Sequence, residues 1–132
     1  MIRYQFITKV YGDLVKQLCT DLEAGEVPMP QILIINSCMW DITRWGPYQE
    51  ENYKGNIIKL FSHLRKFLPD DTLVLWTTTP PVSSERIKGG VLLQQHDFQR
   101  HAMRFIFMEA NSFVQQVCVA FEYDILDLHH KQ

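Results

Sequence analysis

The stretch Ile32-Leu33-Ile34-Ile35-Asn36-Ser37-Cys38-Met39-Trp40-Asp41 places four consecutive aliphatic residues directly before a polar segment. An apolar run of this kind is typical of a strand buried on both faces, as in a parallel sheet covered by helices. In such sheets the ligand lies beyond the carboxyl ends of the strands. Asn36 and Asp41 therefore lie where a functional site is expected, although both residue types are also common in turns.

Hydrophobic periodicity predicts further elements on both sides of this strand. The expected strands are residues 2–8, 32–35, 72–77 and 123–128. The expected helices are residues 11–22, 53–68 and 97–121, of which the first is closed by Gly25 and the second by Pro69. The alternation of strands and helices predicts a three-layer α/β/α fold with a mostly parallel sheet.

The last predicted helix carries phenylalanines at helical spacing, which predicts that they belong to the core. They are Phe98, Phe105, Phe113 and Phe121. The chain opens inside a strand-like segment and stops four residues after Leu128, so we expect an incomplete domain. Aromatic surface or a sheet edge left uncovered in this way favours self-association.

The composition describes an ordinary globular protein. The chain has 132 residues, enough for one domain, with 21% charged residues and a net charge of -2, which argues against a nucleic-acid partner. No apolar run approaches the roughly 18 residues of a membrane span, and no signal peptide or cofactor motif is recognised. Its three cysteines support neither a disulfide framework nor a zinc site, which favours an intracellular, cytoplasmic location.

Several motifs occur together in the order and spacing of one family. They are Asn36-Ser37-Cys38-Met39-Trp40-Asp41, Leu75-Trp76, Gly89-Gly90 before Val91-Leu92-Leu93, Asn111, and Asp124-Ile125-Leu126-Asp127-Leu128-His129. Over nearly its whole length the chain resembles the PC-esterase domain-containing proteins, relatives of the GDSL/SGNH hydrolases. The resemblance implies a flavodoxin-like SGNH-type fold, with residues 1–132 forming a single partial domain. It also implies a parent domain that hydrolyses a small acyl ester with a serine, an acid and a histidine.

Two catalytic motifs of SGNH hydrolases are missing. The Gly-Asp-Ser motif that carries their nucleophile has no counterpart, since Gly12-Asp13 is followed by Leu14. Asp127 to His130 matches Asp-x-x-His literally, but in the relatives this stretch precedes a separate Asp-Gly-Val-His-Trp segment that holds the base. We therefore expect the chain to be inactive, and the alternative is a non-catalytic binding or interaction module derived from the hydrolase fold.

The strand-end residues have both catalytic and structural interpretations. The Asn36 side chain is a candidate oxyanion donor, or it bonds the backbone of its own turn. Asp41 is a candidate catalytic residue, or it caps a helix or pairs with Arg44. Cys38 is either a reactive thiol or a small buried apolar residue.

The same loop contributes candidate substrate-binding residues. Trp40 and Trp45 are suited to hold an apolar acyl or sugar group, although core packing explains most tryptophans equally well. Ser37 is the third candidate, and it is also a possible nucleophile together with Ser83 and Ser84. Nothing in the sequence pairs any of these three serines with His129.

The C-terminal stretch adds a carboxylate and two histidines. Asp127 and His129 share a strand face and are candidates for a polar site at the carboxyl edge of the sheet. With His130 they provide only thin support for a metal site, so we assign none, and a frayed terminus is the alternative. A hydrolase that uses Asp127, His129 or His130 with one of the serines remains a third possibility.

Overall fold

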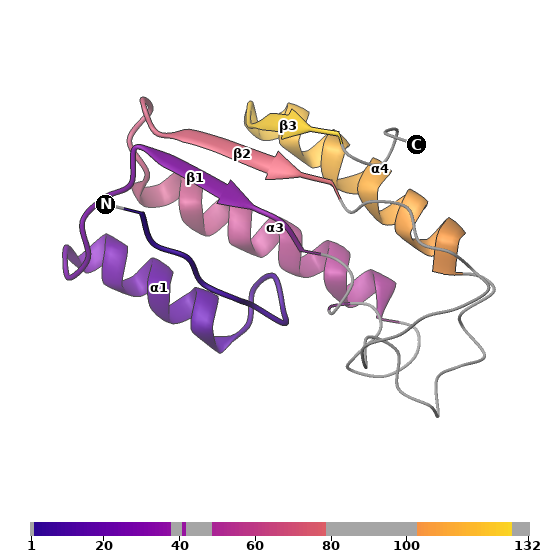
Figure 1. Ribbon diagram of the computed structural model, residues 1–132, viewed down its shortest axis with the longest axis horizontal. Helices are drawn as coiled ribbons and strands as arrows, with labels where there is room; N and C mark the ends of the chain where they lie inside the picture. Colours follow the sequence, from indigo (N-terminus) through magenta and orange to yellow (C-terminus); the bar gives the residue numbers. More distant parts are fainter. Residues whose placement is uncertain (1, 38–40, 42–48, 79–102, 128–132) are drawn as a thin grey trace.

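A parallel sheet of three strands, with helices packed against it, organises the part of the chain that the structure describes (Figure 1). This structure is a computed structural model, and it describes residues 2–37, 41, 49–78 and 103–127. Its elements are α1 (Asp13–Ala24), β1 (Ile32–Ile35), α3 (Glu50–Phe67), β2 (Leu73–Thr77), α4 (Met103–Phe121) and β3 (Asp124–Leu126). The sheet order is β1-β2-β3, and both strand pairs are parallel. The predicted α/β class and parallel sheet are confirmed.

Helix α3 forms the centre of the core, as its sequence predicts. The buried residues of this helix recur every three or four positions: Tyr53, Ile57, Leu60, Phe61 and Leu64. The aromatic ring of Phe61 contacts the rings of Trp76, Phe121 and Tyr123, with centroids 5.8, 5.6 and 5.1 Å away. Because these rings belong to β2, to the end of α4 and to the residue before β3, Phe61 joins three parts of the fold.

The N-terminal segment differs from the prediction, because no strand forms among residues 2–7. The segment runs beside β1 and then turns into α1 (Figure 1). Ile2 and Tyr4 are 97% and 86% exposed, so the alternating apolar residues do not enter the core. Alternation provides an apolar face, but a strand also needs ladder hydrogen bonds with a neighbour.

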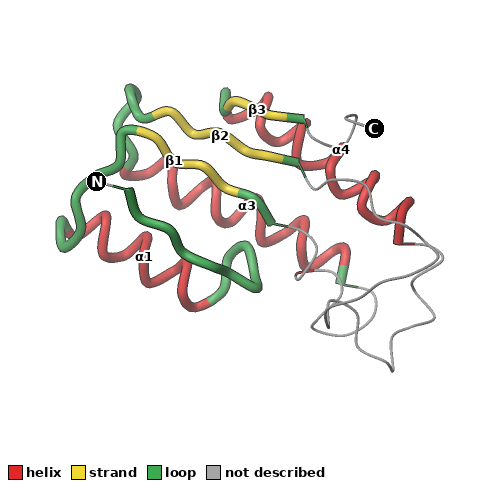
Figure 2. The backbone as a smooth tube through the Cα atoms, viewed as in Figure 1, coloured by secondary structure: helices red, strands yellow, loops and turns green. Residues whose placement is uncertain are grey.

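The helices lie on one face of the sheet (Figure 2). Both crossovers, from β1 to β2 and from β2 to β3, step in the same direction across the sheet, so right-handed connections place α3 and α4 on the same side. On the other face Ile32 and Ile34 are 58% and 62% exposed. The prediction that this strand is buried on both faces is therefore wrong for the described residues. The described residues form two of the three expected layers, which are the sheet and the helical layer on one of its faces.

Of the predicted helix 97–121 the structure describes the part from Met103, as α4, and its buried side is shifted from the predicted one. Its buried residues are Phe107, Ala110, Asn111, Val114 and Cys118. Phe105 is 67% exposed, which contradicts its predicted place in the core, whereas Phe113 and Phe121 pack at the border of the core. Phe98 lies outside the described residues. Since apolar residues occur on several sides of this helix, spacing alone does not select the buried side.

We expect Phe61→Ala to lower the free energy of unfolding by about 3–5 kcal/mol, because it removes a fully buried ring from the contact among α3, β2 and α4. Phe105→Ala is the matched control and is expected to cost less than about 0.5 kcal/mol, since that ring is mostly exposed. Urea unfolding followed by circular dichroism measures both values. Equal losses would contradict the assignment of the buried side of α4.

Candidate functional site

Three strand ends bring polar side chains to the carboxyl edge of the sheet. The Asn36 side chain, directly after β1, donates a hydrogen bond from Nδ2 to the backbone oxygen of Thr77 at 2.8 Å. The hydroxyl of Thr78, after β2, donates to Oδ1 of Asp127 at 3.0 Å. The structure therefore brings the predicted residues Asn36 and Asp127 to one edge, and each of them is bonded to the end of β2.

The Asn36 side chain keeps hydrogen-bonding capacity in this position. It is exposed, and a carboxamide nitrogen carries two N–H groups, of which one is used by Thr77. The bond to Thr77 holds the carboxamide against the neighbouring strand rather than against its own turn. This contact orients the group and leaves a second donor at the edge of the sheet.

Asp41 is buried and connects two segments that are distant in sequence. Its Oδ1 accepts a hydrogen bond from the backbone N–H of Val10 at 2.7 Å, and its Oδ2 accepts one from the hydroxyl of Ser37. The hydroxyl of Tyr53 donates to the backbone oxygen of Ser37 at 3.0 Å. The segment before α1, the end of β1 and the first turn of α3 are thus held together around this carboxylate.

Burial raises the pKa of the Asp41 carboxyl to about 6, because a charged group loses hydration in the protein interior. Hydrogen bonds from Ser37 and from the N–H of Val10 act in the opposite direction, since they stabilise the charged form. The carboxyl therefore changes its charge near neutral pH at a junction of three segments. Arg44, its predicted partner, lies outside the described residues.

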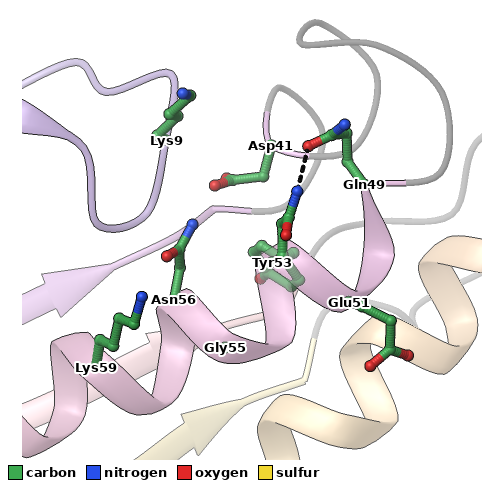
Figure 3. A pocket seen from close by; sticks show the side chains of 9 residues that line it. Lys9, Asp41, Gln49, Glu51, Tyr53, Gly55, Asn56 and Lys59 are labelled. Atoms are coloured by element: carbon green, nitrogen blue, oxygen red, sulfur yellow. Dashed lines mark hydrogen bonds between the residues drawn. The ribbon is translucent and has the colours of Figure 1, made fainter.

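A pocket of about 230 Å³ adjoins Asp41 (Figure 3). The segment before α1 and the first turns of α3 provide most of its lining. The lining residues are Lys9, Asp41, Gln49, Glu51, Asn52, Tyr53, Gly55, Asn56 and Lys59. Within it Nδ2 of Asn52 donates to Oε1 of Gln49 at 3.0 Å. Most of these side chains are polar, which suits a polar ligand better than an acyl chain.

A second polar contact joins α1 to α3 away from this edge. The hydroxyl of Tyr11 lies 2.8 Å from Nδ1 of His63, and Nε2 of His63 lies 3.3 Å from Oε1 of Glu23. The order of groups is that of a catalytic triad, with a hydroxyl, an imidazole and a carboxylate. Burial raises the pKa of the Tyr11 hydroxyl, however, so this tyrosine is not an activated nucleophile.

The thiols of the described region are poor nucleophiles. Cys19 and Cys118 are both free and buried. Burial raises the pKa of each thiol to about 11, which leaves little thiolate at neutral pH. Within the described ranges no group of three or more metal-binding side chains is found.

Several predicted site residues lie outside the described residues, and their roles remain predictions. They are Cys38, Trp40, Trp45, Ser83, Ser84, His129 and His130. Ser37 is described, and its hydroxyl donates to Asp41, so these two candidate catalytic residues form one hydrogen-bonded pair. A serine nucleophile needs a histidine base, and this contact does not supply one.

Sequence reasoning missed Thr78 and the pocket on α3. Thr78 directly follows β2, so the rule that drew attention to Asn36 would have found it too. Asn56 and Lys59 gave no local signal, because polar residues are expected on the outer face of any amphipathic helix. Their position beside Lys9 depends on the fold of the N-terminal segment.

The chain is similar to named proteins of other organisms. It is 33% identical over 129 residues to PC-esterase domain-containing protein 1A of Mus musculus and, to the same extent, of Homo sapiens. It is 34% identical over 132 residues to PC-esterase domain-containing protein 1B of Homo sapiens. Each of these matches covers 98% of this chain. The chain belongs to the PC-esterase domain-containing family.

The predicted family is thereby confirmed, although the chain spans only 28–30% of the length of these three PC-esterase domain-containing relatives. No family model matches the chain, and no solved structure matches it. The described motif residues lie on or beside the sheet: Asn36 and Ser37 follow β1, Leu75 and Trp76 are in β2, and Asn111 is buried on α4. No helix of the described region is long and apolar enough to span a membrane.

We expect the stability contributed by Asp41 to fall as the pH rises. The folded pKa of about 6 exceeds the ordinary value of 3.8, so the folded state binds the proton more tightly than the unfolded state. This stabilisation is complete at pH values below the ordinary pKa of the carboxyl. It is lost as the pH rises past the pKa of the folded state. Because one pKa unit corresponds to about 1.4 kcal/mol, this difference amounts to about 3 kcal/mol.

Asp41→Asn removes this titration and retains an acceptor for the N–H of Val10. The stability of the variant relative to the wild type is therefore expected to increase by about 2.4 kcal/mol between about pH 4 and about pH 7.5. Urea unfolding at both pH values measures it. Asp71→Asn, in an exposed turn, controls for the loss of a carboxylate. A relative stability of Asp41→Asn that does not change with pH would refute the expectation.

Proposed function

We propose that this chain contributes one wall of the active site of an ester-hydrolysing domain and that residues 1–132 alone do not hydrolyse esters. The observation that carries the proposal is the position of Asn36, an exposed amide donor held at the carboxyl edge of a parallel sheet. The names of the relatives support an esterase as the parent domain. The substrate class that we propose for it is a small acyl ester.

In this proposal Asn36 stabilises the developing oxyanion of the ester. An oxyanion donor is effective when the protein orients it before the reaction, and the bond to Thr77 restrains the Asn36 carboxamide in that way. Thr78 and Asp127 lie at the same edge and border the same site. Loss of one such donor typically lowers the rate by roughly 10²–10³.

The proposed lack of activity in residues 1–132 follows from the missing nucleophile and base. The sequence has no Gly-Asp-Ser, and the Ser37 hydroxyl is bonded to a carboxylate rather than to an imidazole. Without members of the triad, only binding and oxyanion groups contribute to the rate.

The hydrolysis of p-nitrophenyl acetate by purified residues 1–132 tests this proposal. We expect no turnover above that of a heat-treated sample, because nucleophile and base are missing. Asn36→Ala and, as the matched control, Asn52→Ala are measured in parallel. Turnover that is lost in Asn36→Ala and retained in Asn52→Ala would show an active esterase and overturn the proposal.

We also propose an interaction role, which the uncovered sheet favours. On the face that α3 and α4 leave open, the exposed Ile32 of β1 lies beside Leu73 of β2, which is 41% exposed. Ile34 of β1 and Leu126 of β3, which is 45% exposed, belong to the same face. Adjacent aliphatic side chains on neighbouring strands form an exposed apolar patch, which typically marks an interaction surface. Self-association through this face and its sheet edge would bury the apolar patch away from water.

We expect residues 1–132 to associate in a concentration-dependent manner in sedimentation velocity experiments. Ile34→Glu places a charge in the centre of the patch and is expected to shift the protein toward monomer. Ile58→Glu changes a 46% exposed residue on α3 and serves as the matched control. A wild-type chain that is monomeric at every concentration would contradict the interaction role.

A further inference from the structure

We infer that the open face of the sheet is covered by helix α4 of a second copy of this chain, in a head-to-tail contact. The inference rests on the interaction role proposed above and names the surface that meets the apolar patch. Two exposed apolar surfaces of different kinds carry it, one on the sheet and one on α4.

The open face of the sheet is suited to a helix. Parallel sheets are normally covered by helices on both faces, and α3 and α4 of the same chain cover one face here (Figure 2). The register places Ile32 of β1 beside Leu73 of β2, and Ile34 beside Leu75. Leu126 of β3 continues this face. Neighbouring strands about 4.8 Å apart form a strip roughly 10 Å wide across the sheet, close to the roughly 10–12 Å diameter of one helix with its side chains.

Helix α4 carries a second apolar side that faces solvent. Phe105, Met108 and Val119 are 67%, 45% and 72% exposed. Their spacing places them on one side of the helix, where they span about 21 Å along its axis. The exposed Ser112 and Gln116, which lie between them on the same side, are uncharged. This side therefore resembles the core-facing side of a helix, for which solvent is an unfavourable neighbour.

The charges around the two surfaces permit the contact. Glu109 borders the exposed side of α4, and its Oε1 lies 2.8 Å from Nζ of Lys54, which compensates its charge. Among the described strand residues, Asp124 is the charged one, and it lies on the outer strand β3. A helix centred on β2 thus meets aliphatic side chains, with Asp124 at the rim, where interfaces are polar and in contact with water.

The two surfaces lie on opposite sides of the molecule. Helix α4 turns Phe107, Val114 and Cys118 toward the core beneath the sheet, so Phe105 and Val119 point away from the sheet. One copy can therefore offer its α4 to the sheet of a neighbour while its own sheet receives the α4 of another copy. Such a contact between unlike surfaces does not close after two copies, so the assembly grows with concentration. Each internal copy gains a helical layer on the open face of its sheet.

The test combines two variants of residues 1–132 in sedimentation velocity experiments. Ile34→Glu blocks the sheet face, and Phe105→Glu blocks the exposed side of α4. Each is expected to weaken self-association by about tenfold or more, because the contact would bury an unpaired carboxylate. An equimolar mixture is expected to form a 1:1 dimer that does not grow further, since one variant keeps its α4 and the other keeps its sheet face. A fluorescent label on one variant identifies both chains in the complex.

Ile58→Glu, on the neighbouring α3, is the matched control and is expected to associate as the wild type does. Ile32→Glu replaces Ile34→Glu if the latter loses its cooperative thermal unfolding. If Phe105→Glu associates as strongly as the wild type, or if the mixture remains monomeric, the contact with α4 is overturned and the interaction role stands. A wild-type chain that is monomeric at every concentration would overturn both.

Discussion

The contact between Phe61 and Trp76 is the interaction on which the rest of the structure depends. Phe61 is fully buried on α3, and its ring also contacts Phe121 and Tyr123, which flank the turn from α4 into β3. One side chain therefore fixes α3 over β2 and anchors the connection that brings β3 alongside. The alignment of the three strands follows, and with it the common edge at which their polar residues meet.

That edge is stabilised by hydrogen bonds between strand ends, whereas the neighbouring pocket depends on a buried carboxylate. Burial of Asp41 is unfavourable for its charge, as the raised pKa indicates, and the N–H of Val10 and the Ser37 hydroxyl offset part of this cost. The arrangement holds the N-terminal segment in place without strand pairing. It also places Lys9 beside α3, so the pocket is a consequence of the same carboxylate.

The sequence correctly predicts those helices whose local pattern is compatible with one buried side or one end point. The buried residues of α3 follow one stripe with mostly polar residues elsewhere, and Gly25 ends α1 with a φ of 80°, which suits glycine. The buried side of α4 was not predictable in the same way, because apolar residues surround that helix. The bond between Asp41 and Val10 joins residues 31 positions apart, so no local pattern contains it. Residues 2–7 alternate as a strand does, but pairing depends on a neighbour as well.

The parallel sheet of the described residues bears directly on the chemistry that we propose for its carboxyl edge. A parallel sheet aligns strand ends in one row, so it can orient a carbonyl group against donors such as Asn36. Nucleophilic attack also requires a serine and a histidine within about 3 Å of each other, held by rigid elements. In the described residues the hydroxyls of Ser37 and Thr78 at this edge both donate to carboxylates. The role that we propose for this edge is therefore to polarise an ester, whereas cleavage requires an imidazole base that the described residues of the edge do not include.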